Sequence, residues 1–179
     1  MAWGRMGSGL CLMGTPLYRD CPGCGVRLPM SEAQPNARYN ASAECLQLYG
    51  ELTTYTLTRG DGAFIHQLAV DAYSAQHAGD NMRPIGVAFA LIGLYLACER
   101  GYSGRQVQHM HMLLARRSKT WPRFVPPPHV GSVTVLDVVR AHPEEERDAM
   151  LQRWGQAVWD AWPQEHERVK ALVASVMAD

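Results

Sequence analysis

After Asn40, apolar residues recur three or four positions apart along most of the chain, and few stretches alternate between polar and apolar as half-exposed strands do. Because this spacing places apolar side chains on one face of a helix, it predicts a succession of amphipathic helices. Stops that contain glycine separate the first four helices, which we expect at residues 42–57, 62–77, 84–100 and 103–117. The pattern therefore indicates an all-α fold.

The segment 84–100 differs from the others because it is apolar nearly all round, which predicts a central position in an up-down helical bundle. Its apolar stretch between Arg83 and Glu99 covers about 15 residues, fewer than the ~20 that a helix needs to span a bilayer. We therefore expect a buried core helix and no membrane partner.

Three consecutive prolines, Pro126–Pro128, follow the fourth helix. Proline lacks a backbone N–H and clashes with the preceding turn, so residues 121–128 cannot be helical. They predict an extended Pro-rich strap that wraps the bundle. Helical spacing then resumes, and it predicts additional C-terminal helices at 134–141, from Pro143 onward, and through the apolar positions Val169 to Val176.

A chain of 179 residues fits one domain, which we place at residues 21–179, and residues 1–20 are expected to be a poorly structured extension. The 17 basic and 17 acidic residues balance, so no overall field attracts nucleic acid. One basic cluster at 116–119 is typical of a solvated helix end. The five cysteines, without a secretory pattern, favour a reducing cytoplasmic location.

The chemistry of the chain centres on Cys21-Pro-Gly-Cys24-Gly25. Two cysteines joined by a Pro-Gly turn present both thiolates to one point, which is half of a tetrahedral zinc site. A redox-active disulfide is the alternative for this spacing. The sequence favours a metal, because the strand and helix that flank such a motif in thioredoxin-like proteins are missing here.

The motifs resemble those of an uncharacterised bacterial family, common in actinobacteria, whose members open with CPGCG. The resemblance covers roughly residues 21–165 and implies no activity, because the family has no assigned function. It rests on CPGCG and on six further stretches: Glu44-Cys45 with Leu48–Leu52, His66–Leu68, Val70–Tyr73 with Gln76-His77, Glu99–Gly101 with His111, Pro126-Pro127, and Val158–Trp162.

If neighbouring helices run up and down, residues that are equally far from the turn between them lie at the same level along the bundle axis, which we call depth. Depth matching of this kind places Cys45, Tyr73 and His77 at the end where the CPGCG loop enters. Cys21, Cys24, Cys45 and His77 would then complete a closed Cys₃His zinc site. The alternative is that Cys45 is a small buried hydrophobe and His77 a cation at a helix C-terminus. If the fourth ligand differs, His66 is the next candidate.

The same matching brings Glu51, His66 and His111 to one level. Two histidines and one carboxylate form an open site that suits zinc, iron or manganese and leaves positions for water or substrate. The alternative is a neutral core histidine that is hydrogen-bonded to a carboxylate. Asp71 is a candidate base or an ion-pair partner, and Tyr73 is a pocket donor or an ordinary core aromatic.

These sites lead to two functional hypotheses. The first is a small-molecule metalloenzyme of hydrolase or lyase type, in which metal-bound water attacks and Glu51 or Asp71 acts as base. Its catalytic set would be Glu51, His66, Asp71, Tyr73 and His111. The second is a non-enzymatic module with a structural zinc, whose tryptophan-bearing C-terminal helices bind a protein partner. A homo-oligomer is compatible with either hypothesis.

Overall fold

Seven α-helices and one short antiparallel hairpin make up the part of the chain that this computed structural model describes, residues 17–177. The prediction of an all-α fold is confirmed. Along the chain, the elements are β1 (Tyr18–Asp20), β2 (Arg27–Pro29), α1 (Ala43–Thr58), α2 (His66–Gln76), α3 (Pro84–Cys98), α4 (Gly104–Arg117), α5 (Val135–Arg140), α6 (Glu144–Asp160), the 3₁₀ turn η1 (Pro163–Glu165) and α7 (His166–Met177).

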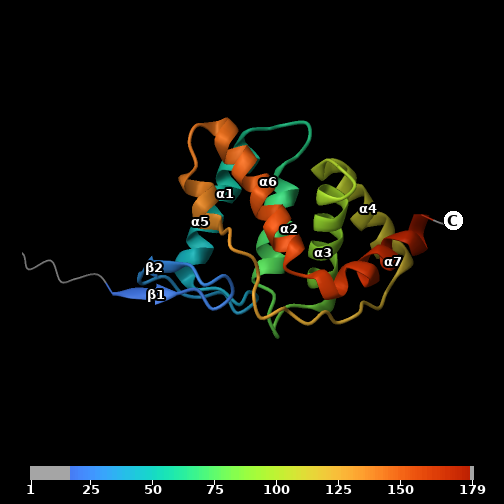
Figure 1. Cartoon of the computed structure of the whole chain (residues 1–179), viewed down its shortest axis with the longest axis horizontal. Coiled ribbons are helices and arrows are strands. Elements are labelled where there is room, and N and C mark those ends of the chain that lie inside the picture. The colour runs from blue at the N-terminus through green and yellow to red at the C-terminus, as the bar shows by residue number, and fades with distance from the viewer. Residues whose placement is uncertain (1–16, 178–179) are drawn as a thin grey trace, which may run out of the picture.

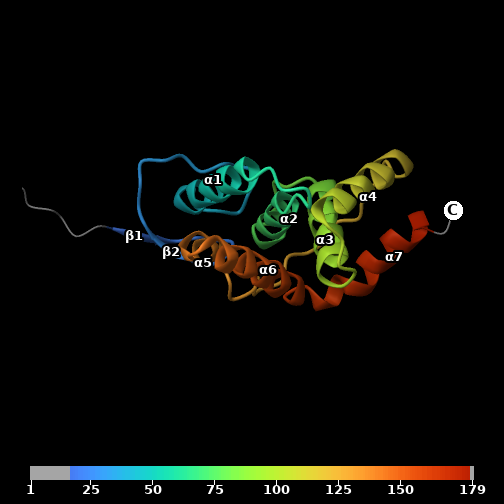
Figure 2. The same cartoon turned by 90° about the horizontal axis from the view of Figure 1, so that it is seen from above.

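The helices form two layers. Helices α1 to α4 follow one another across the molecule, and α5, α6 and α7 run along one side of them (Figures 1 and 2). Helix α5 packs on α1, α6 packs on α2 and α3, and α7 packs on α3 and α4. The core lies between the layers, where Trp154, Trp159 and Trp162 are almost completely buried.

Helix α3 is central, as its apolar sequence predicted. It contacts α2, α4, α6 and α7, and Leu91, Ile92 and Leu94 are fully buried. In the described residues, no helix combines the length and the hydropathy of a bilayer span.

The helix ends follow the capping residues of the sequence. The Ser42 hydroxyl accepts a hydrogen bond from the backbone N–H of Cys45, and capping boxes begin α4 at Ser103 and α5 at Thr134. Helix α2 differs from the prediction, because it begins at His66 instead of residue 62. The reason is a turn at Phe64, whose φ of 59° is incompatible with a continuous helix.

Between α4 and α5 the chain has no helix or strand, as the consecutive prolines predicted. We extend the name strap to this whole connection, residues 118–134, which the buried Gln76 side chain anchors from α2. The amide nitrogen of Gln76 donates to the carbonyl oxygens of Val130 and Val133, at 3.0 and 2.9 Å, and its oxygen accepts from the Trp154 indole at 2.9 Å. One side chain therefore joins α2, the strap and α6.

The β-hairpin was not predicted. Strands β1 and β2 pair antiparallel, with Tyr18 opposite Pro29 and Asp20 opposite Arg27. Each strand has three residues, which is too short for an alternating pattern to be recognised. Strand β1 belongs to the segment 1–20 that was expected to be poorly structured, and residues 1–16 lie outside the described part of the chain.

Candidate metal centre

The hairpin presents Cys21 and Cys24 on the loop between its strands. The Cys21 N–H donates to the Val26 carbonyl and the Gly25 N–H donates to the Cys21 carbonyl, each at 2.8 Å. Gly25 has a φ of 75°, which favours glycine at this position. These bonds fold the loop into a tight knuckle with both sulfur atoms on its inner side.

Helices α1 and α2 supply the other two groups. Cys45 lies in the first turn of α1, and His77 directly follows the last residue of α2. The loop packs closely onto them at Gly23, where a Cβ atom would collide with the Asn40 carbonyl and lie 2.7 Å from His77 Cδ2. The glycine between the two loop cysteines therefore lets the knuckle reach the histidine.

The four ligand atoms of Cys21, Cys24, Cys45 and His77 all lie within 4.8 Å of one another. Cys24 Sγ is 3.8 Å from Cys45 Sγ, and Cys45 Sγ is 3.4 Å from His77 Nε2. Zn–S and Zn–N bonds of about 2.3 and 2.0–2.1 Å in a tetrahedron separate two sulfurs by about 3.8 Å and sulfur from nitrogen by about 3.6 Å. Both separations match a tetrahedral metal site. The three cysteines are free, and the 3.8 Å between the sulfurs of Cys24 and Cys45 is far too long for a disulfide bond.

Neighbouring groups orient the side chains of Cys21 and His77 toward the centre of the cluster. The Ser42 N–H donates to Cys21 Sγ at 3.4 Å. His77 Nδ1 lies 2.9 Å from the Tyr73 carbonyl oxygen, which can only accept, so Nδ1 carries the proton and Nε2 presents its lone pair. The Tyr73 ring stacks on the imidazole with centroids 4.1 Å apart and fixes its plane.

The electrostatics of the cluster also favour a cation. Hydrogen bonding to Cys24 lowers the pKa of Cys21, whereas hydrogen bonding to Cys21 raises the pKa of Cys24 to about 12. Cys45 is fully buried, and hydrogen bonding to Cys21 raises its pKa. Ionised sulfurs this close together repel one another, and a divalent cation would allow all three to ionise.

The structure does not bring Glu51, His66 and His111 together. Among the described residues, Cys21, Cys24, Cys45 and His77 form the one group of three or more His, Cys, Asp or Glu side chains that could hold a metal. Glu51 is exposed on α1. Depth matching compares only levels along the bundle, and the solvent-facing position of Glu51 shows that depth alone does not determine proximity.

The two histidines of that set have separate surroundings. His66 Nδ1 lies 2.8 Å from the Thr56 hydroxyl oxygen on α1, and burial lowers its pKa. The His111 ring stacks on Phe89 of α3 with centroids 4.5 Å apart, and burial lowers its pKa to about 4. Both are therefore neutral imidazoles packed against helix neighbours.

Asp71 and Tyr73 lie in different parts of the structure. Tyr73 belongs to the metal centre, because its hydroxyl lies 4.0 Å from Cys45 Sγ and its ring contacts His77. Asp71 precedes His77 by nearly two helical turns on α2. It is buried, its Oδ1 accepts from Gln67 Nε2 at 3.0 Å, and burial raises its pKa well above the usual value.

Sequence reasoning missed the residues that support the ligands. The hairpin, the Ser42 N–H and the Tyr73 carbonyl all act through backbone geometry, which side-chain patterns do not reveal. The sequence contains one sign of the hairpin, the apolar–polar–apolar alternation of Val26, Arg27 and Leu28. This alternation extends over only three residues.

Comparison with known proteins identifies a family. The profile of a family described as a family of unknown function (DUF5946) matches residues 19–163, which is most of the chain and includes all four residues of the metal centre. No curated protein and no solved structure matches the chain.

Proposed function

The chain belongs to this family of unknown function, DUF5946, and we propose from its own residues that it is a zinc protein whose metal fixes the hairpin to the helical domain. The main support for this proposal is that three sulfur atoms and one imidazole nitrogen lie within 4.8 Å of one another. Soft thiolate ligands in tetrahedral geometry favour Zn²⁺ over the oxygen-preferring divalent cations.

A structural role for the zinc fits the site better than a catalytic one. Four protein ligands complete a tetrahedron, so no position is left for water or substrate. Cys21, Cys45 and His77 are buried, which further shields the metal. Activation of water, the mechanism expected for a metalloenzyme, therefore has no support at this centre.

The burial pattern also bears on the alternative of a partner-binding module. That hypothesis assigned the partner surface to the tryptophan-bearing C-terminal helices. Trp154, Trp159 and Trp162 are at most 1 % exposed and form the core between the two helix layers. These side chains stabilise the domain, and they offer no surface to a partner.

The metal content of purified protein tests the proposal. We expect about one zinc per chain in the wild type, and loss of the metal in Cys21→Ser and Cys24→Ser. Because the binding free energy of a structural zinc is folding free energy, both variants should also melt on the order of 10 °C lower. Elemental analysis and thermal unfolding provide the two measurements.

Cys98→Ser is the matched control, since Cys98 is a free, half-buried cysteine outside the cluster. It should keep its full zinc content. Substitution with Co²⁺ should give the visible absorption of a tetrahedral thiolate site in the wild type and in Cys98→Ser. Full zinc content in both Cys21→Ser and Cys24→Ser would contradict the assignment.

A further inference from the structure

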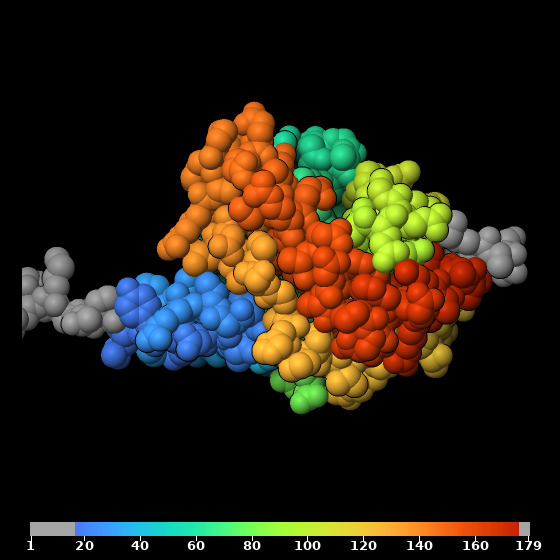
Figure 3. Space-filling view, viewed as in Figure 1, coloured from blue at the N-terminus to red at the C-terminus, as the bar shows by residue number. Residues whose placement is uncertain are grey.

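A cavity of about 450 Å³ lies among α2, α3, α4 and α6, and none of its lining residues is a metal ligand. Its volume is within the range of small-molecule sites. The loops before α2 and before α4 form part of its wall. In the space-filling view the surfaces around residue 60 and around residues 100–104 adjoin α6 at the upper edge of the molecule (Figure 3).

The walls of the cavity are largely apolar. Ile65 directly precedes α2, and Leu68 lies in the first turn of that helix. Ala97 contributes from the last turn of α3, and Val107 from the first turn of α4. Such walls favour a ligand with an apolar body, because its transfer from water to this surface is favourable.

Asp71 is the most unusual group in the lining. Its side chain is 3 % exposed, and its carboxyl packs so closely on α3 that a Cβ atom at position 93, which is Gly93, would collide with Oδ2. The Gln67 amide is a neutral hydrogen-bond donor to Oδ1. Burying a carboxyl beside a neutral donor is costly, and such groups concentrate at functional sites.

Asp61 supplies a second acceptor. Its Oδ1 accepts from the Ile65 N–H at 3.2 Å, whereas its Oδ2 is buried and has no hydrogen-bond partner among the described residues. The one basic group in the lining, Arg59, is already engaged in an ion pair with Asp148. The lining also contains the neutral polar residues Tyr102, Ser103 and Gln152. Its two remaining acids, Asp61 and Asp71, form no ion pair within the described part of the chain.

We propose that this cavity binds a small organic amine, with its ammonium group held by Asp71, its apolar body against Ile65, Leu68, Ala97 and Val107, and Asp61 as a further acceptor for the same ligand. An ammonium compensates a buried carboxylate and donates the hydrogen bonds that both acids accept. A carboxylate ligand would instead place its negative charge beside two acids, with Arg59 already paired. The proposal does not depend on the zinc.

Three probes of one shape and different charge test this assignment: 2-phenylethylamine, 2-phenylethanol and phenylacetate. We expect the amine to bind in titration calorimetry and to raise the melting temperature of the wild-type protein. The alcohol and the acid should bind at least about tenfold more weakly, since they lack the charge-assisted hydrogen bond. Absence of amine binding at millimolar concentration, or tighter binding of phenylacetate, would overturn the proposal.

Asp71→Asn keeps the shape of the side chain and its acceptor for Gln67 but removes the charge. It should weaken amine binding about tenfold or more. The same variant should raise the melting temperature of the ligand-free protein at pH 7, because the folded state no longer buries a carboxyl. Undiminished amine affinity in a folded Asp71→Asn would overturn the role of Asp71.

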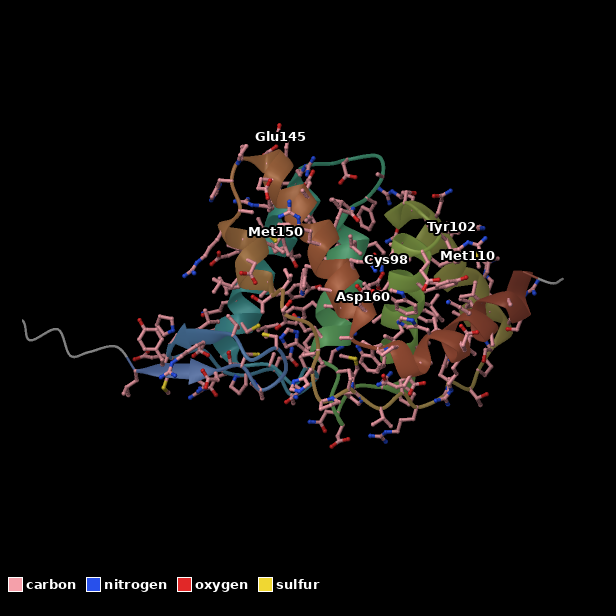
Figure 4. The ribbon with its side chains drawn as sticks, in the orientation of Figure 1. Cys98, Tyr102, Met110, Glu145, Met150 and Asp160 are labelled. Carbon is pink, nitrogen blue, oxygen red and sulfur yellow. The ribbon has the colours of Figure 1, made fainter. Side chains whose placement is uncertain are left out.

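Two further variants complete the test. Ala97→Leu fills part of the cavity and should abolish amine binding without changing the charge. Glu145→Gln is the charge-matched control, because Glu145 is exposed at the start of α6, away from Tyr102 of the cavity wall (Figure 4). It should bind the amine as the wild type does. All variants should keep equal zinc content, so failure here is distinguishable from failure of the metal assignment.

Discussion

At the scale of single residues, the fit between the CPGCG loop and α2 depends on the missing side chain of Gly23. A methyl group there would collide with the Asn40 carbonyl and approach His77 Cδ2 to 2.7 Å. We expect Gly23→Ala to destabilise the protein by about 1–3 kcal/mol, as overpacking does, and to weaken zinc retention. Urea unfolding and metal analysis give the two readouts.

Gly50→Ala is the matched control for that substitution. Gly50 is exposed in α1, and a Cβ atom there has no neighbour within 4 Å. Alanine should stabilise the protein by about 0.4–1 kcal/mol, because it restricts the unfolded chain. The two glycine variants should thus differ in sign, and a stabilising Gly23→Ala would refute the close approach.

His111 should make stability depend on pH. Burial lowers its pKa to about 4 in the folded protein, against about 6.5 when unfolded, so the unfolded chain binds more protons between these values. Stability should therefore fall as the pH decreases from 6.5 to 4. The loss that is due to His111 should be about 2–3 kcal/mol.

Urea unfolding of the wild type and of His111→Phe across this range provides the measurement. Phenylalanine keeps an aromatic ring against Phe89 but cannot titrate. Both proteins share the four residues of the candidate metal centre, so any acid-induced metal loss cancels in the difference between them. Parallel stability curves for the two proteins would show that His111 does not titrate as its burial requires.

At the scale of elements, α2 organises the domain, because Gln76 near its end holds the strap and α6. Gln76→Leu would leave two strap carbonyls and the Trp154 indole N–H without their partner. Each lost partner costs about 1–3 kcal/mol, so we expect destabilisation of about 3 kcal/mol or more. Gln156→Leu on the exposed face of α6 should cost less than about 1 kcal/mol.

Guanidinium unfolding of both glutamine variants provides the measurement, and amide hydrogen exchange would locate the effect. In Gln76→Leu, the amides of the strap should exchange faster than in the wild type. If the two variants had equal stability, the strap would be held by something other than Gln76.

The elements also show where sequence reasoning succeeds. Ser42, Ser103 and Thr134 mark helix starts because a capping hydroxyl acts locally, on backbone groups two or three residues away. The hairpin was missed because its three-residue strands are specified by a cross-strand partner and by the loop between them. Local chemistry can be predicted from a single sequence, whereas pairing between short segments cannot.

At the scale of the whole molecule, the same distinction separates the two predicted sites. Cys21, Cys24, Cys45 and His77 were predicted together, because the CPGCG motif supplies half of a metal site and depth matching placed Cys45 and His77 at the end of the bundle where its loop enters. Glu51, His66 and His111 matched in depth alone, and Glu51 faces solvent. Depth follows from helix length, but the direction of a side chain depends on helix rotation, which tertiary packing determines.

The ligands of the metal centre are spread widely along the chain, with Cys24 and Cys45 21 positions apart and Cys45 and His77 a further 32 apart. During synthesis, the two loop thiols leave the ribosome well before His77, and two thiols cannot close a tetrahedral site. Tight metal capture by the four residues would therefore wait until α2 has emerged and docked on α1. Metal uptake by this cluster would then report the completion of a tertiary fold, whereas in a short zinc finger it would report the ordering of a local segment.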